Sequence, residues 1–258
     1  MRRIAVALMA LAAGAAGAQE PVRLYAAGSL RAAMTEIVAA SRIPAAATFG
    51  ASGLLRERIE NGESADLFAS ADMGHPRRLA ASGRAGEVLL FTRNRLCALA
   101  APGIEVTSET LLERMLDPAV KLGTSTPRAD PSGDYAFALF GKAEALRPGA
   151  RAALEAKALQ LTGGPNSPAP PPGRSVYAML VDQRAADVFL TYCTNALEAR
   201  REVPGLSIVQ VPPPLAVGAD YGLAILKNAR AGTEELARFI LSPEGQAILE
   251  KHGFAAGR

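Results

Sequence analysis

The sequence predicts an α/β fold in which mostly parallel strands are covered by helices on both faces. Short apolar runs alternate with longer helical stretches from residue 22 to the end of the chain, and this alternation is typical of parallel sheets. Small polar turns join strand to helix at several of these points. About 240 residues follow an N-terminal leader, which is enough for one large domain or for two lobes of roughly 100 residues each.

The first 18 residues have the features of a secretory signal peptide. Met1-Arg2-Arg3 forms a basic start, residues 4–13 form an apolar core, and Ala16-Gly17-Ala18 forms a small-residue cleavage site. We therefore expect cleavage after Ala18 and a periplasmic location. The apolar core is too short to span a membrane, and no later run approaches ~20 apolar residues, so we expect no membrane insertion of the mature chain.

The first third of the chain predicts three strand–helix units. Ser29 is expected to cap the first helix, and Asn61-Gly62 is expected to end the second. In such sheets ligands bind beyond the carboxyl ends of the strands, where the connecting turns lie. The predicted strands are 22–26, 45–49 and 65–70, and the predicted helices are 30–40, 54–60 and 73–82.

The rest of the chain continues the pattern with weaker signals. Residues 166–173 are rich in proline and predict a stiff, polyproline-like loop. The predicted strands are 95–101, 120–123, 187–192 and 221–226, and the predicted helices are 111–116, 135–145, 176–183, 233–241 and 245–252.

Composition argues against several classes of function. The net charge is only +3, and no basic run is interleaved with aromatic residues, so we expect no binding to nucleic acid. The chain has only two histidines, His75 and His252, so we expect no Cys/His metal site. Cys97 and Cys193 would face an oxidising compartment and could form a disulfide. Both lie in apolar runs, however, and this setting favours buried free thiols.

Four turns of small and polar residues carry the functional prediction. Each precedes or enters a predicted helix, whose free N–H groups and dipole attract an anion. Their glycines leave room for a ligand against the backbone. The alternative is that Ser29 and Ser52 serve only as helix caps. The turns are Ala26–Ser29, Gly50–Gly53, Asp130–Tyr135 and Gly173–Ser175, and together they predict the capture of an oxyanion.

Catalytic motifs are weak by comparison, and we expect no catalytic residue. The chain contains no G-x-S-x-G elbow, no phosphate-binding G-x-x-x-x-G-K-[ST] loop and no H-E-x-x-H pair. An exported hydrolase that used Ser29 or Ser52 would need His75 or His252, and both histidines lie in polar settings.

Several strings of residues resemble those of the molybdate- and tungstate-binding periplasmic proteins of ABC importers, a type II solute-binding family. The resemblance covers residues 22–254, and its most specific part is Ala65-Asp66-Leu67-Phe68-Ala69-Ser70-Ala71-Asp72. The other strings are Leu24–Leu30, Phe49–Leu54 and Ser242–Phe254.

This resemblance implies a two-lobed type II periplasmic binding protein fold, with a ligand cleft between two lobes that each contain a sheet flanked by helices. Residues 19–95 and 215–258 would form the first lobe, and residues 96–214 the second. The ligand would be a tetrahedral oxyanion, molybdate or tungstate, held by hydroxyl and backbone N–H groups. The resemblance implies no cofactor, no bound free metal cation, a monomeric protein, and delivery of the anion to an ABC permease.

The ligand-binding residues follow from the resemblance by position. Ser29 and Ser52 would bind from the first lobe, and Ser132 and Tyr192 from the second. The fourth turn leaves the remaining contact open among Arg174, Ser175 and the N–H of Val176.

The second lobe departs from the family pattern at several points. Asn195 replaces the usual aspartate, and residues 166–173 form an insertion. The Asp130–Tyr135 turn also resembles that of archaeal-type tungstate binders, in which carboxylates complete the coordination of the metal. One alternative is therefore a small organic anion bound in the same fold, with Arg174 as its partner.

Overall fold

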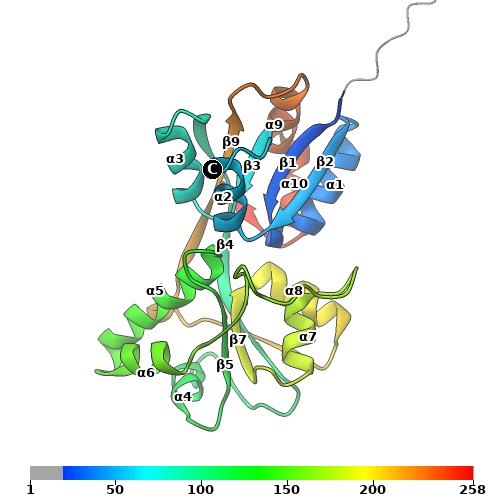
Figure 1. The fold of residues 1–258 in the computed structure, drawn as a ribbon. Helices are drawn as coiled ribbons and strands as arrows, with labels where there is room; N and C mark the ends of the chain where they lie inside the picture. The colour runs from blue at the N-terminus through cyan, green and yellow to red at the C-terminus, as the bar shows by residue number, and fades with distance from the viewer. Residues whose placement is uncertain (1–19, 258) are drawn as a thin grey trace, which may run out of the picture.

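The computed structural model describes residues 20–257 and consists of two lobes joined by long strands (Figure 1). The predicted signal peptide and its cleavage site lie outside the described residues. The first lobe, at the top of Figure 1, contains both ends of the described chain, and the second lobe, below, contains its middle. No helix within residues 20–257 combines the length and the apolar character that crossing a membrane requires.

The first lobe is a five-stranded sheet in the order β2-β1-β3-β9-β4, to which β10 adds a short edge pairing with β4. Its strands are β1 (Val22–Ala27), β2 (Ala45–Gly50), β3 (Leu67–Ser70), β9 (Gly218–Leu226), β10 (Ala255–Ala256) and the first part of β4 (Ala85–Ala100). Its helices are α1 (Arg31–Ser41), α2 (Ser52–Glu60), α3 (Gly74–Ala81), α9 (Thr233–Leu241) and α10 (Pro243–Lys251), with a 3₁₀ turn η1 (Gly28–Leu30).

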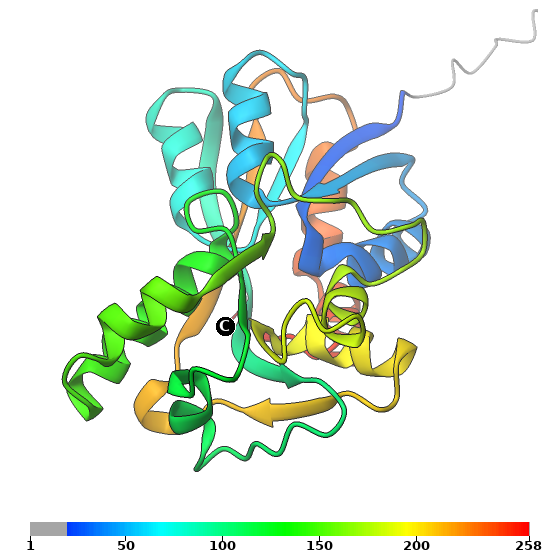
Figure 2. The ribbon, with the colours of Figure 1, turned by 60° about the horizontal axis from the view of Figure 1, so that its bottom comes forward.

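The second lobe continues the sheet in the order β4-β7-β5-β6, and β8 pairs with the other edge of β4. Figures 1 and 2 show its helices on opposite sides of these strands, α5 and α6 in green and α7 and α8 in yellow. The strands are β5 (Leu122–Ser125), β6 (Leu159–Thr162), β7 (Val188–Tyr192) and β8 (Ser207–Gln210). The helices are α4 (Leu111–Leu116), α5 (Pro131–Leu146), α6 (Ala150–Lys157), α7 (Val176–Asp182) and α8 (Cys193–Glu202), with a 3₁₀ turn η2 (Pro213–Leu215).

Strand β4 belongs to both lobes. It pairs with β9 up to Arg95 and with β7 from Leu96 onward. The partner of β4 therefore changes between Arg95 and Leu96. Because β4 carries the chain into the second lobe and β9 carries it back, the two run antiparallel. The α/β fold and its two lobes are thus confirmed, but the sheets are mixed rather than mostly parallel.

Several elements were not predicted from the sequence. The first ten residues of β4 mix charged and apolar side chains, and α8 begins directly after β7 with no turn between them. The elements α6, β6 and β8 were also missed. The expected cap at Ser29 is wrong, because α1 is preceded by the η1 turn and no side chain caps either element.

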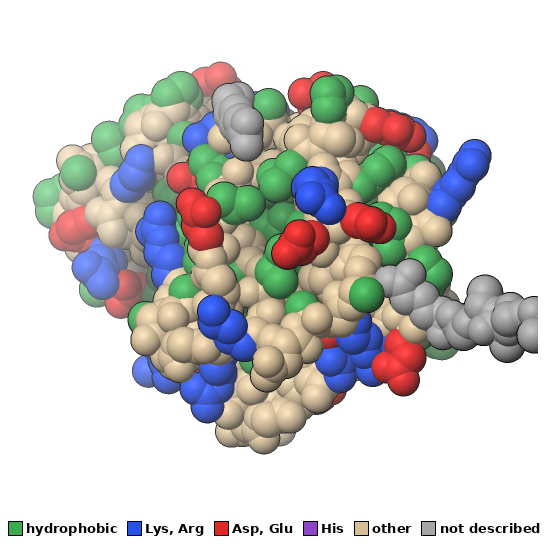
Figure 3. Space-filling model, turned by 90° about the horizontal axis from the view of Figure 1, so that it is seen from above, with side chains coloured by type: hydrophobic (Ala, Val, Ile, Leu, Met, Phe, Trp, Pro, Cys, Tyr) green, Lys and Arg blue, Asp and Glu red, His purple; other side chains and the backbone are tan. Residues whose placement is uncertain are grey.

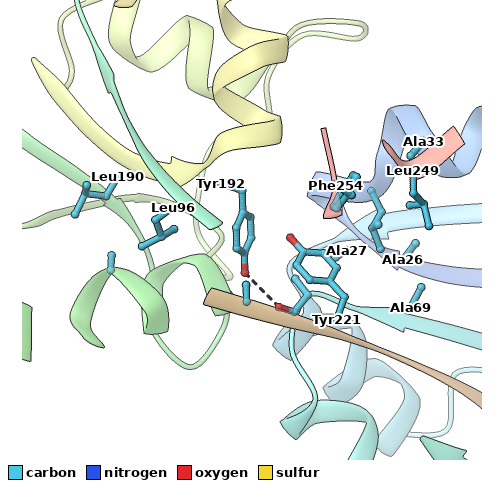
Figure 4. Packing of buried hydrophobic residues seen from close by; sticks show 14 of the residues in the cluster. Ala26, Ala27, Ala33, Ala69, Leu96, Leu190, Tyr192, Tyr221, Leu249 and Phe254 are labelled. Atoms are coloured by element: carbon cyan, nitrogen blue, oxygen red, sulfur yellow. Dashed lines mark hydrogen bonds between the residues drawn. The ribbon is translucent and has the colours of Figure 1, made fainter. Parts of the chain in front are cut away.

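One hydrophobic cluster runs through both lobes. It includes Leu24 and Leu67 from the first lobe and Leu122 and Phe140 from the second. Figure 4 shows Tyr192 and Tyr221 lying between the aliphatic side chains of the two sides. The lobes therefore share a continuous apolar contact in this structure.

Cys97 and Cys193 form a disulfide, with their Cα atoms 4.8 Å apart. The expectation of free thiols is therefore wrong. Antiparallel pairing sets Cys97 opposite Thr191, two residues before Cys193, and a sequence alone does not reveal this pairing. The apolar surroundings that suggested buried thiols suit a buried disulfide equally well.

Replacing both cysteines by alanine is expected to lower the free energy of unfolding by about 2–4 kcal/mol, because the bridge joins residues 96 positions apart. Denaturant unfolding with and without reductant measures this. Reduction should bring the wild-type protein close to the stability of the Cys97→Ala/Cys193→Ala variant and should leave that variant unchanged. Equal stability of the oxidised wild-type protein and the variant would contradict the prediction.

Candidate functional site

Ser29 lies in the η1 turn after β1, at the face of the first lobe that meets the second. The residue is only 9% exposed, and its Oγ lies 2.9 Å from the hydroxyl oxygen of Tyr221 in β9. Tyr221 is fully buried, and burial raises the pKa of its hydroxyl. The pair therefore remains two neutral hydroxyl groups at neutral pH.

Ser52 and Tyr192 both form hydrogen bonds with the backbone of Ala71, just after β3. The Oγ of Ser52 accepts the Ala71 N–H at 3.0 Å, and the Tyr192 hydroxyl donates to the Ala71 carbonyl at 3.3 Å. Tyr192 comes from the second lobe, so this last bond joins the lobes (Figure 4). The rings of Tyr192 and Tyr221 pack edge-to-face with centroids 5.6 Å apart.

Three of the predicted ligand residues, Ser29, Ser52 and Tyr192, are therefore brought together between the lobes. Neither serine caps a helix. No side chain forms a capping hydrogen bond at the start of η1 or of α2, and each serine hydroxyl forms its hydrogen bond elsewhere. The capping alternative for these serines is therefore wrong. Their hydroxyls face the junction of the two lobes.

Asn94 and Thr194 extend this cluster and were missed from the sequence, as was Tyr221. The side-chain amide of Asn94 in β4 donates to Thr194 Oγ1 at 2.9 Å and to the Tyr221 hydroxyl at 3.2 Å. Asn94 and Thr194 are both buried. In the sequence, Asn94 is distinguished only as an asparagine between two arginines before Leu96. Its hydrogen-bond partners cannot be identified without knowing that β4 pairs with β9.

Ser132 lies at the start of α5, where Asp130 is the N-cap. The Asp130 carboxylate accepts the Ser132 N–H at 3.0 Å, so this backbone donor is already engaged. The Ser132 hydroxyl is different. Together with the hydroxyls of Thr124 and Ser125, it is buried and has no hydrogen-bond partner among residues 20–257. The second lobe thus offers buried hydroxyls beside a capping carboxylate.

Asp130 sits in an unfavourable setting for a charge. Burial raises the pKa of its carboxyl group to about 6. The hydrogen bond from the Ser132 N–H opposes this shift in pKa, and the nearby charge of Asp134 adds to it. Burial also raises the pKa of Asp134, whose carboxylate accepts the Arg128 N–H at 2.8 Å.

The turn that carries Asp130 touches the first lobe at α2. The Gly53 N–H donates to the Ala129 carbonyl at 2.9 Å. A Cβ atom at Gly53 would lie 2.5 Å from the Arg128 carbonyl oxygen, so only glycine allows this approach. The second and third predicted anion turns therefore contact each other directly.

Ser175 and Val176, by contrast, are not hydrogen-bonded to the cluster around Ser29, Ser52 and Tyr192. Ser175 is the N-cap of α7, and its Oγ accepts the Ala178 N–H at 3.3 Å. Its own N–H donates to the Glu202 carboxylate at 2.7 Å, which also pairs with Arg174. Val176 is the first residue of α7 and is half-buried.

The histidines do not complete a catalytic set. His75 Nδ1 accepts from Arg56 at 3.2 Å, and His252 Nε2 pairs with Glu36 at 2.8 Å. Within the described part of the chain, neither ring is a hydrogen-bond partner of Ser29 or Ser52. Residues 20–257 contain no group of three or more His, Cys, Asp or Glu side chains that could hold a metal ion.

Comparisons with known proteins agree with this architecture. An uncharacterized protein of Pasteurella multocida strain Pm70 is 37% identical over 242 residues, which cover 90% of this chain and 98% of that protein. The periplasmic molybdate-binding protein of Azotobacter vinelandii is 18% identical, with a TM-score of 0.73 over 91% of this chain and 98% of the other. The sulfate-binding protein SubI of Mycobacterium tuberculosis H37Rv is 15% identical, with a TM-score of 0.69 over 91% of this chain and 86% of the other.

These two structures share the two-lobed fold of type II periplasmic binding proteins. The family described as bacterial extracellular solute-binding protein matches residues 22–255, which include both lobes and the cluster between them. The chain belongs to the bacterial extracellular solute-binding protein family.

Proposed function

We propose that this protein captures a tetrahedral oxyanion, molybdate or tungstate, between its lobes and delivers it to an ABC permease. The observation that carries the proposal is the cluster of buried neutral hydroxyls of Ser29, Ser52 and Tyr192 at the junction of the lobes. Hydrogen bonds to a charged partner are about twice as strong as neutral ones, so uncharged donors can hold a dianion in a dry cleft. The molybdate- and sulfate-binding proteins of the same fold support this choice.

The fold suits capture by closure of two lobes about a hinge. The chain passes between the lobes in β4 and in the segment before β9, and these crossings can bend while each lobe moves as a unit. Contacts such as Gly53–Ala129 and Tyr192–Ala71 hold the lobes together in this structure. Separation of the lobes would expose Ser29 and Ser52 to solvent.

The remaining features of the proposal concern location and partners. We propose export with cleavage after Ala18, action in the periplasm as a monomer, and no cofactor apart from the transported anion. The surface seen in Figure 3 carries acidic and basic side chains interspersed. Such a surface suits a freely diffusing carrier better than it suits a nucleic-acid-binding protein.

The organic-anion alternative relied on Arg174. Its guanidinium pairs with Glu202, and its side chain is 47% exposed. An exposed and paired arginine is a weak anchor for a ligand carboxylate. The geometry therefore favours the hydroxyl cluster over Arg174.

Calorimetry with molybdate, tungstate, sulfate and phosphate tests the proposal. We expect the wild-type protein to bind molybdate and tungstate. Ser29→Ala and Ser52→Ala should each weaken binding by roughly 10-fold or more, because each removes a hydrogen bond to a charged ligand. Arg174→Ala serves as the control and should bind as the wild-type protein does. Failure of all four anions to bind would refute oxyanion capture, and a large loss in Arg174→Ala alone would favour the organic anion.

Asp130→Asn is expected to strengthen the binding of molybdate at neutral pH. Asparagine caps a helix about as well as aspartate does, and the change removes a negative charge beside the anion. Because the pKa of Asp130 is about 6, the wild-type carboxyl loses its proton as the pH rises through that value. Wild-type affinity should therefore fall between about pH 5 and pH 8, while that of the variant should change less.

Calorimetric titrations across that pH range give the measurement. The exposed Asp182 at the end of α7 provides the matched control, because Asp182→Asn removes the same charge from the same lobe. Its affinity should follow the wild-type curve. Parallel curves for the wild-type protein and Asp130→Asn would show that Asp130 does not act on the anion.

A further inference from the structure

A proline-rich segment, residues 164–173, lies between β6 and α7, and we call it the strap. Five of its ten residues are prolines, and none of the ten is charged. Proline fixes its own φ angle and has no N–H group, so such a segment stays extended and stiff without internal hydrogen bonds. The strap is therefore suited to move as one stiff unit.

The strap starts beside the third predicted anion turn. Gly163, which precedes the strap, has a φ of +77°, and a Cβ atom there would lie 2.5 Å from the Cβ atom of Asp130. The first residues of the strap form a turn in which the Gly164 N–H donates to the Ser167 hydroxyl at 2.9 Å. Because the turn that carries Asp130 contacts α2 of the first lobe, the strap starts at the junction of the lobes.

The other end of the strap is held by one carboxylate. Glu202 in α8 pairs with the Arg174 guanidinium and accepts the Ser175 N–H at 2.7 Å. Gly173 has a φ of +77°, which glycine adopts without strain, and a Cβ atom there would meet no other atom within 4 Å. The backbone at this end therefore has open space around it, and Glu202 is what fixes it to the second lobe.

The middle of the strap lies along the junction of the lobes. Figures 1 and 2 show it in yellow-green, running from β6 to α7 over the side of α7 and α8 that faces the first lobe. Pro170 is half-buried between exposed neighbours, so this part of the strap rests on other residues. Within residues 20–257, the hydrogen bonds of the strap close its own turns, and none reaches the first lobe.

We propose that the strap is a gate at the junction of the lobes, which limits how fast the anion enters and leaves and does not contribute to its affinity. This inference rests on the proposed oxyanion function. Because the strap is attached to the second lobe alone, it still spans part of the opening when the lobes begin to separate, until it rotates away at Gly173. A segment with the same contacts in the free and bound protein changes the rates and not the equilibrium.

Stopped-flow measurement of molybdate binding tests the gate. The chain has five tyrosines and no tryptophan, so tyrosine fluorescence can report an anion that binds beside Tyr192. Replacing residues 165–172 by a glycine–serine sequence of the same length turns the stiff strap into a flexible chain. We expect the association and dissociation rate constants to rise several-fold together and the dissociation constant to stay as in the wild-type protein.

Glu202→Gln tests the same gate with a single substitution. The variant removes the charge that holds Arg174 and keeps an oxygen that can accept the Ser175 N–H. Both rate constants should rise by about two- to five-fold, which corresponds to the loss of one exposed ion pair. Glu155→Gln is the matched control, because it breaks the pair of Glu155 with Arg151 in α6 of the same lobe. It should leave both rate constants unchanged.

A measurement without any anion separates the gate from the proposed function. Ser29→Cys places a thiol at the junction, and it is the only free thiol because Cys97 and Cys193 form the disulfide. In this background, both strap variants should speed the reaction of the thiol with iodoacetamide by about the same factor as they speed association. Glu155→Gln should leave the labelling rate unchanged.

Each outcome decides between the two ideas. Equal association, dissociation and labelling rates in the wild-type protein and both strap variants would overturn the gate. Faster dissociation at an unchanged association rate would overturn it too, because the strap would then contribute to affinity. If the wild-type protein binds none of the anions while both strap variants still speed labelling, oxyanion capture fails and the control of access by the strap is supported.

Discussion

The continuous pairing of β4, first with β9 and then with β7, is the constraint on which the rest of the structure depends. One strand of 16 residues belongs to the sheets of both lobes, and a strand of that length extends about 50 Å. It places Asn94 beside Tyr221 on the first-lobe side and Leu96 beside Tyr192 on the second. The polar cluster between the lobes exists because these two pairings follow each other along one strand.

The two lobes differ in the chemistry that they bring to this junction. The first lobe presents the hydroxyl of Ser29, which is hydrogen-bonded to the Tyr221 hydroxyl, and that of Ser52, which accepts the Ala71 N–H. The second presents the hydroxyl of Tyr192, buried hydroxyls without partners, and the carboxyl group of Asp130. A carboxylate near an anion site opposes binding unless it is protonated or neutralised. In the proposed function, selection among anions would therefore depend on the second lobe as much as on the first.

The unpartnered hydroxyls of Thr124, Ser125 and Ser132 also bear on stability. A buried polar group without a hydrogen bond typically costs about 1–3 kcal/mol. Native proteins keep few such groups, and those that remain often belong to functional sites. Their grouping at the end of β5 and the start of α5 marks the region where the second lobe faces the first.

The sequence by itself determined the α/β class, the order of most helices and strands, and the turns that carry Ser29, Ser52 and Ser132, because apolar periodicity and glycine-rich turns are local properties of the chain. It could not determine the partners of side chains far apart in sequence. The disulfide between Cys97 and Cys193, the hydrogen bond between Ser29 and Tyr221, and the amide of Asn94 between Tyr221 and Thr194 all depend on how the strands pair across the sheets. Only the tertiary structure decided these contacts, because strand register depends on how the whole sheet packs and not on any one segment.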